Sequence, residues 1–87
     1  MQKKIVFSPH ALHQISDRGA TEGEIIQAIE GGEKQPAKKG RAAFRKNFSF
    51  EKHWKGRYYS TKQVMAIVAD TPDEQVVVTV FTFFFGG

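Results

Sequence analysis

The chain has no cysteine among its 87 residues. This absence excludes disulfide bonds, a thiol nucleophile and thiolate metal sites, and it is typical of a reducing compartment. The first seven residues hold two lysines and too few apolar residues for a signal peptide or a membrane span. We therefore expect a cytoplasmic protein that is neither exported nor inserted in a membrane.

Motifs for metal, nucleotide and acyl chemistry are also missing. The three histidines are not clustered with carboxylates at a metal-ligand spacing, and no glycine-rich stretch precedes the Lys-Ser/Thr of a phosphate-binding loop. None of the serines has the context of a catalytic triad. We predict no metal and no cofactor.

Acidic residues are scarce in the middle of the chain. From Lys34 to Lys62 ten Lys and Arg residues accompany one acid, Glu51, which gives a formal charge of +9. The remainder carries three cations and eight carboxylates, or −5, so the total is +4. Charge concentrated in this way attracts phosphate-rich partners by steering and counterion release. The segment therefore predicts a surface that binds RNA or another polyanion.

The composition is that of one globular domain covering residues 1–87. Hydrophobic residues make up 40% and charged residues 25%, and eight phenylalanines supply much of the apolar area. No internal repeat or long linker divides the chain. A domain of this size builds a single core of modest size.

The first third of the chain predicts a short strand and two helices. Residues 5–7 are apolar and strand-like, and Ser8-Pro9 is a helix start. That helix covers 10–18 and stops at Gly19. Thr21 and Glu24 have the spacing of a capping box for a second helix that ends at residues 31–32. We expect the two helices to pack as a hairpin.

The rest of the chain predicts a loop and then three or four strands. Phe44, Phe48 and Phe50 share one parity, and Arg45, Asn47 and Ser49 share the other, so this strand is half-buried. We expect a loop at 33–40, a strand at 41–50 and a turn at 51–56. Residues 57–69 predict one bent strand or two, with a bend near 60–63. A turn at 70–73 then leads to a central strand at 75–85 that is buried on both faces. The fold class is α+β, with helices on one face of a mostly antiparallel sheet.

Five residues are candidates for metal-free RNA cleavage. Imidazole titrates near neutral pH and suits proton transfer, and strand-borne cations are rigid enough to stabilise a phosphorane. In this hypothesis His10 is the general base or acid, Arg45 and Arg57 stabilise the phosphorane, and Tyr59 or Lys62 assists the leaving group. An equally simple interpretation is a solvated charged face with aromatic residues buried beneath it.

Further basic and aromatic residues are candidates for RNA binding without chemistry. Aromatic faces stack on unpaired bases, and loop lysines attract phosphates. Arg18 has a competing structural role, an ion pair with Asp17, Glu22 or Glu24. The predicted RNA-binding residues are Arg18, Lys38, Lys39, Arg41, Lys46, Lys52, Trp54, Lys55 and Tyr58.

Several segments resemble one family over nearly the whole chain. Residues 7–12, 17–21, 40–47, 54–59 and 76–81 resemble the domain of unknown function 4258 family, although Ala20 stands where that family usually has isoleucine. The family is similar to RelE-type toxins and BrnT-type ribonucleases, which implies a small helix-plus-sheet fold and metal-independent RNA cleavage. The matching positions are His10, Arg18, Arg45, Arg57 and Tyr59.

Two alternatives to a ribonuclease remain open. The first is a regulatory or nucleic-acid-binding module without catalysis, which uses the same charge but no proton-transfer group. The second is a protein-interaction domain, because Phe83, Phe84 and Phe85 form a more aromatic run than one small core requires. Its partner would be an antitoxin or a second copy of the chain, bound through the C-terminal aromatic strand.

Overall fold

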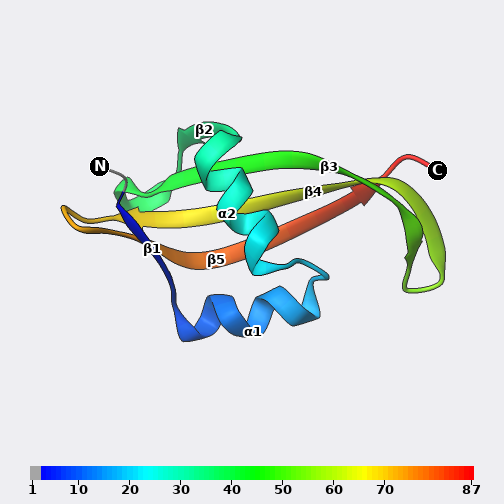
Figure 1. The fold of residues 1–87 in the computed structure, drawn as a ribbon, viewed down its shortest axis with the longest axis horizontal. Coiled ribbons are helices and arrows are strands. Elements are labelled where there is room, and N and C mark those ends of the chain that lie inside the picture. The colour runs from blue at the N-terminus through cyan, green and yellow to red at the C-terminus, as the bar shows by residue number, and fades with distance from the viewer. Residues whose placement is uncertain (1–2) are drawn as a thin grey trace.

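The computed structural model describes residues 3–87 and has an α+β fold (Figure 1). A strand and two helices precede four further strands, so the predicted fold class and order are confirmed. The elements are β1 (Lys4–Phe7), α1 (Pro9–Asp17), α2 (Glu22–Gly31), β2 (Glu33–Pro36), the 3₁₀ turn η1 (Lys38–Gly40), β3 (Ala42–Trp54), β4 (Arg57–Asp70) and β5 (Glu74–Phe85).

The five strands form one sheet in the order β1-β5-β4-β3-β2. All neighbours are antiparallel except β1 and β5, which run parallel and pair only over Glu74–Val77 of β5. A parallel pair needs a long connection, and the two helices lie in the stretch of chain that separates β1 from the meander β3-β4-β5. The sheet is therefore mostly antiparallel, as predicted.

Both helices begin where the sequence predicts. The Ser8 hydroxyl accepts a hydrogen bond from the Ala11 backbone N–H over 3.1 Å. In the second helix Thr21 Oγ1 accepts from the Glu24 N–H over 3.1 Å, and Glu24 Oε1 accepts from the Thr21 N–H over 3.0 Å. The reciprocal pair is a capping box, so both predicted N-terminal caps are confirmed.

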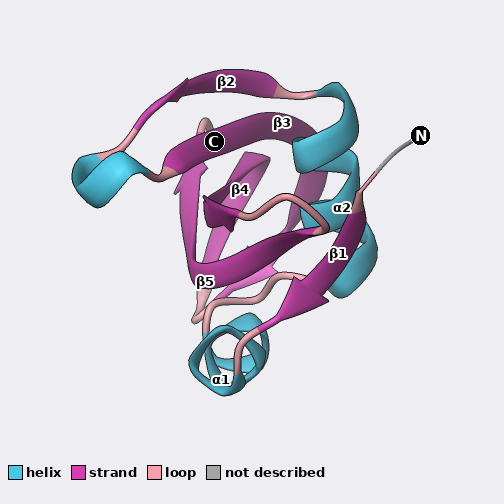
Figure 2. Cartoon of the chain, turned by 90° about the vertical axis from the view of Figure 1, so that its left-hand side faces the viewer, coloured by secondary structure: helices cyan, strands magenta, loops and turns pink. Residues whose placement is uncertain are grey.

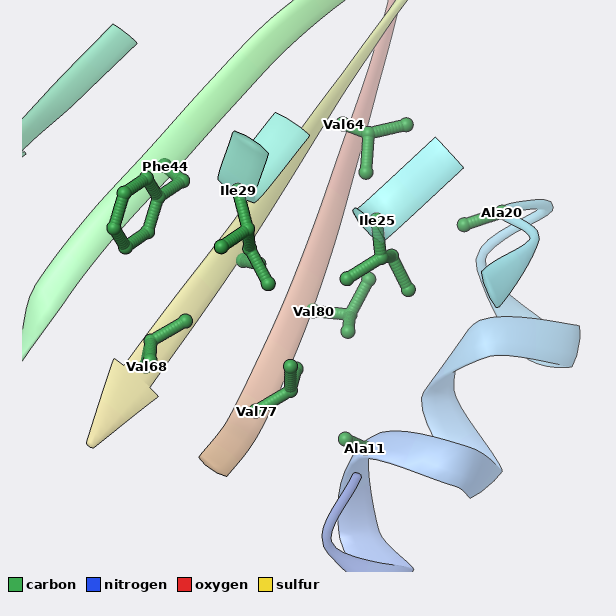
Figure 3. Packing of buried hydrophobic residues seen from close by; sticks show 10 residues of the cluster. Ala11, Ala20, Ile25, Ile29, Phe44, Val64, Val68, Val77 and Val80 are labelled. Carbon is green, nitrogen blue, oxygen red and sulfur yellow. The ribbon is translucent and has the colours of Figure 1, made fainter. Parts of the chain in front are cut away.

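The helices make their main contacts with the sheet rather than with each other as a hairpin. α2 packs across β4 and β3, whereas α1 packs along β5. Figure 2 shows α1 beside β5 and β1, separate from α2. The core lies between the two helices and the sheet and includes Ala11, Ile25, Ile29, Phe44, Val64, Val68, Val77 and Val80 (Figure 3). Each buried Ile, Val or Phe contributes about 1.5–3 kcal/mol of transfer free energy.

Helix α1 covers part of the outer edge of β5 that β1 leaves free. The side-chain Oε1 of Gln14, a residue only 9% exposed, accepts the Val80 backbone N–H over 2.8 Å. The Thr82 hydroxyl donates to the Arg18 carbonyl. A helix at a strand edge satisfies backbone groups that another chain could otherwise pair with.

Two predicted boundaries are wrong. The predicted loop at 33–40 contains β2, and β3 runs on to Trp54 instead of turning after Phe50. Of the two alternatives predicted for 57–69, one strand or two, the structure has the single strand β4. β5 is not buried on both faces, since Phe83 and Phe85 are nearly half exposed. The register of β3 against β4 shifts between Ser49 and Lys52, and this bulge lets the strand continue while changing direction.

Candidate nucleic-acid interface

Alternation along the strands separates two faces of the sheet. Lys62, Val64, Ala66 and Val68 of β4 are buried beneath the helices, and the residues between them point the other way. We call this other side the open face. By register it carries Arg45, Asn47 and Ser49 of β3, Thr61, Gln63, Met65 and Ile67 of β4, and Thr79, Phe81, Phe83 and Phe85 of β5. The predicted opposite parity of Arg45 and Phe44 is thereby confirmed.

The β3-β4 hairpin closes in a tight turn at Lys55 and Gly56. Both residues have positive φ, 52° and 84°, and Trp54 pairs directly with Arg57. Two positive φ values are the requirement of a hairpin turn whose twist matches the strands, and glycine adopts them without strain. Figure 1 shows this end of the hairpin curving away from the rest of the sheet. The turn therefore fixes the directions of the side chains that flank it.

Four aromatic rings gather at the base of this hairpin around Phe84. The Phe84 centroid lies 5.1 Å from Phe50, 5.2 Å from Trp54 and 5.6 Å from Tyr59, and the Trp54 ring is stacked on it at 16°. We call Phe50, Trp54, Tyr59 and Phe84 the hairpin cluster. Their contact across three strands makes this curved end of the sheet a packed unit.

Exposed cations surround the hairpin cluster. Lys52 lies 6.0 Å above the Phe50 ring, Lys55 lies 5.5 Å above Trp54, and Arg57 lies 5.8 Å above Tyr59. Such cation–π contacts stabilise exposed sites by about 0.5–1 kcal/mol each. They hold the charged groups beside flat rings while leaving them accessible to solvent, an arrangement that suits phosphates and bases together.

The turn between the helices supports Trp54 from below. Gly19, at φ 72°, lies against the indole, and a Cβ added there would be 2.8 Å from a ring carbon of Trp54. Only glycine fits both the backbone conformation and this approach. The sequence predicts Gly19 as a helix stop, and the structure adds this second reason for it.

Lys62, predicted to assist the leaving group, is a buried structural residue. It is 6% exposed, and its Nζ donates to the Gly19 carbonyl and to Glu24 Oε1, both over 2.8 Å. Its ammonium therefore lies under the α1–α2 turn. The Lys62 ammonium is therefore not available to a substrate oxygen.

The other four predicted catalytic residues occupy three separate places. The Ser8 N–H bonds to the Val77 carbonyl, so exposed His10 begins α1 near the start of β5. Phe85 lies about 26 Å from Val77 along β5, at about 3.3 Å per strand residue, and Arg57 and Tyr59 lie at that far end. Arg45 lies on the open face, where its guanidinium donates to Glu33 over 3.1 Å. The structure brings together only Arg57 and Tyr59.

The predicted RNA-binding residues fall into two groups and two single positions. Lys52, Trp54, Lys55 and Tyr58 lie on the hairpin, and Lys38, Lys39 and Arg41 line a groove of about 410 Å³ with Ile67 and Phe81 of the open face. Lys46 is half-buried on the helix-facing side. The Arg18 guanidinium lies 5.1 Å above the Phe81 ring, and Glu24, one of its expected partners, binds Lys62 instead.

Sequence reasoning missed Phe84 as the centre of the hairpin cluster. The alternation of side chains along the strand could have indicated this position, because Phe84 follows Val80 and Thr82 at two-residue steps. In the structure Phe84 pairs with Lys62. His53 is a second omission, and its ring lies 5.7 Å from that of Tyr58 at 70°.

Residues 3–87 were also searched for metal-binding groups and for membrane-spanning helices. Within this range no three His, Asp or Glu side chains gather in a group that could hold a metal ion. No helix of the described chain is long and apolar enough to cross a membrane.

Comparisons of the chain with protein-family models, with curated proteins and with solved structures find no match. The resemblance to the domain of unknown function 4258 family stays a prediction from the sequence. The features of the molecule that bear on function are therefore the hairpin cluster and the open face.

Proposed function

We propose that this protein is a cytoplasmic RNA-binding domain that contacts RNA with its β3-β4 hairpin. One observation carries the proposal: Lys52, Lys55 and Arg57 each lie over a ring of the hairpin cluster. The cations supply sites for phosphates, and the exposed ring of the neighbouring Tyr58 supplies a face for a base. Binding without catalysis is favoured because His10 and Arg57 lie near opposite ends of β5.

The charge of the hairpin predicts how steeply the RNA affinity falls as the salt concentration rises. For single strands the logarithm of the affinity falls with the logarithm of the salt concentration, with a slope of about −0.7 for each phosphate neutralised. Three cations on one hairpin therefore contribute a slope of about −2.

Fluorescence anisotropy with a labelled single-stranded 12-nucleotide RNA tests this proposal. The titration is repeated from 50 to 200 mM salt, with EDTA present throughout. Lys52→Gln and Lys55→Gln should each weaken the slope by about 0.7. Lys4→Gln, at an exposed lysine on β1 outside the basic segment, is the matched control and should leave the slope unchanged. Absence of salt-dependent binding, or equal slopes in all variants, would overturn the proposal.

Metal-independent cleavage by the same hairpin is a second candidate function. The Arg57 guanidinium lies 5.8 Å from the Tyr59 centroid, and Lys52 pairs with Tyr59 across the strands. The reaction forms a bond from the RNA 2′-oxygen to phosphorus and breaks the bond to the 5′-oxygen. Water would accept the proton of the 2′-hydroxyl, and Arg57 would stabilise the phosphorane. The Tyr59 hydroxyl would protonate the departing 5′-oxygen and regain its proton from water.

Mass spectrometry of RNA incubated in chelator tests this second candidate. The expected products end in 2′,3′-cyclic phosphate and 5′-hydroxyl groups. Tyr59→Phe should abolish them at unchanged RNA affinity, and His10→Ala should leave them unchanged. RNA that stays intact at saturating protein rules out cleavage and leaves the binding proposal standing.

A further inference from the structure

The open face carries a row of three phenylalanines along β5. Phe81, Phe83 and Phe85 follow one another at two-residue steps and therefore point to the same side. Phe83 is 46% exposed and Phe85 is 45% exposed. The Phe81 and Phe83 centroids lie 6.5 Å apart, with the rings inclined by only 22°. The row is a strip of flat apolar surface, with α2 packed on the opposite side of the sheet.

Cations lie at both ends of this row. At the Phe81 end, Lys38, Lys39 and Arg41 line the groove of about 410 Å³. At the Phe85 end, Arg57 and both tyrosines of β4 line an open pocket of about 540 Å³. The apolar strip thus runs between a pocket that contains one arginine and a groove that contains three cations.

We propose that the row Phe81, Phe83 and Phe85 is a base-stacking surface for single-stranded nucleic acid. The inference rests on the proposed RNA binding and names its ligand class. Bases stack on the exposed rings, and the flanking phosphates reach Arg57 at one end and Lys38 with Lys39 at the other. A duplex hides its base faces within its own stack, so this surface distinguishes single strands from duplexes.

Charge argues for a nucleic acid rather than a second copy of the chain. A dimer that joined two open faces would bring together two sets of the cations that flank the row. Like charges brought into contact oppose association, whereas a polyanion neutralises them. Beside Phe83 the Gln63 amide donates to Asn47 Oδ1 over 2.9 Å, and amides of this kind can also bond to base edges.

The test compares one RNA sequence as a single strand and as a duplex, in the same anisotropy assay. Phe83→Ala should lower the single-strand affinity about 5-fold to 150-fold, which corresponds to the roughly 1–3 kcal/mol of one stacked base. Phe83→Leu should lose nearly as much, because leucine is apolar but has no flat face. Duplex affinity and the salt slope should not change. Leu12→Ala, at a leucine 47% exposed on α1, is the control for loss of an exposed apolar side chain.

Each contrary result has a distinct meaning. If Phe83→Leu binds single strands as tightly as wild type, stacking is overturned while salt-dependent RNA binding stands. If wild type binds no RNA at all, the proposed function fails as well. A dimer in sedimentation equilibrium that Phe83→Ala dissociates, at unchanged RNA affinity, overturns the inference in favour of a protein interface. Urea midpoints near wild type verify that each variant is folded.

Discussion

Replacing Lys62 with methionine removes one ammonium group and keeps most of the side-chain stem. The ammonium donates to the Gly19 carbonyl and to Glu24 Oε1, and the same Glu24 oxygen accepts the Thr21 N–H. One carboxylate oxygen therefore connects β4 with the capping box of α2. If Lys62 is structural, its loss should destabilise the fold and leave RNA binding unaffected.

The loss of folding stability expected for Lys62→Met follows from the two hydrogen bonds of the ammonium group. A hydrogen bond to a charged group contributes about 1.5–3 kcal/mol, and a buried carbonyl left without a donor costs about 1–3 kcal/mol. The Glu24 side chain is 20% exposed, so water restores part of its solvation. We therefore take the lower halves of both ranges, which gives about 3 kcal/mol. A domain of this length is stable by roughly 4–13 kcal/mol, so the loss is a large fraction of the total.

Urea unfolding followed by the fluorescence of Trp54, the single tryptophan, measures this loss. With a slope of about 1–3 kcal/mol per molar, the midpoint should fall by about 1–3 M. Lys46→Met is the matched control, because Lys46 is on the same sheet face and has no ion pair within residues 3–87. Adding Glu24→Gln to Lys62→Met should cost less than the sum of the two single changes.

Two results would refute the structural role of Lys62. A midpoint within experimental error of wild type would mean that the buried ion pair contributes nothing, as some buried pairs do. A fully folded Lys62→Met protein that has lost RNA binding or cleavage would show that the ammonium serves RNA. That second outcome would restore the role predicted from the sequence.

Two more predictions concern residues that join the helices to the sheet. Gln14→Leu leaves the Val80 N–H without its acceptor and should cost about 1–3 kcal/mol of folding stability, whereas Gln14→Glu keeps the acceptor. Urea midpoints and hydrogen exchange of the Val80 amide distinguish the two variants. Equal midpoints would contradict the edge-capping role of Gln14. Gly19→Ala forces a Cβ into positive φ and against Trp54, and should cost more than the roughly 1–2 kcal/mol of the backbone conformation alone. Trp54→Ala should reduce that cost in a double-mutant cycle read by thermal melting, and no coupling would refute the contact.

The local parts of the fold were predictable because each depends on neighbouring residues. Ser8 and the Thr21–Glu24 pair satisfy helix N–H groups within one turn, so their spacing is visible in the sequence. Alternation along β3 separates Phe44 from Arg45 for the same reason. Such signals require no knowledge of which strands are adjacent.

The parts that were not predicted depend on contacts between distant residues. β2 has the sequence Glu-Lys-Gln-Pro, without an apolar residue, and becomes a strand because it pairs with the outer edge of β3. The position of His10 relative to Arg57 depends on where α1 meets β5. Lys62 is an intermediate case, since its parity with Val64 and Val68 indicates the buried face while its charge favours the surface.

The separation of charge along the sequence is only partly kept in space, and this has consequences for binding. The acids of the helices include Glu24, which neutralises Lys62 inside the fold, so this cation of the basic segment does not face solvent. Arg45 is paired with Glu33 at the β2 edge. Arg57 of the hairpin and the lysines of η1 lie at the two ends of the phenylalanine row, and Arg18 lies over the Phe81 ring. A strand of RNA bound between them would have its phosphates held at the ends and its bases on the rings, so salt and ring substitutions should weaken binding independently.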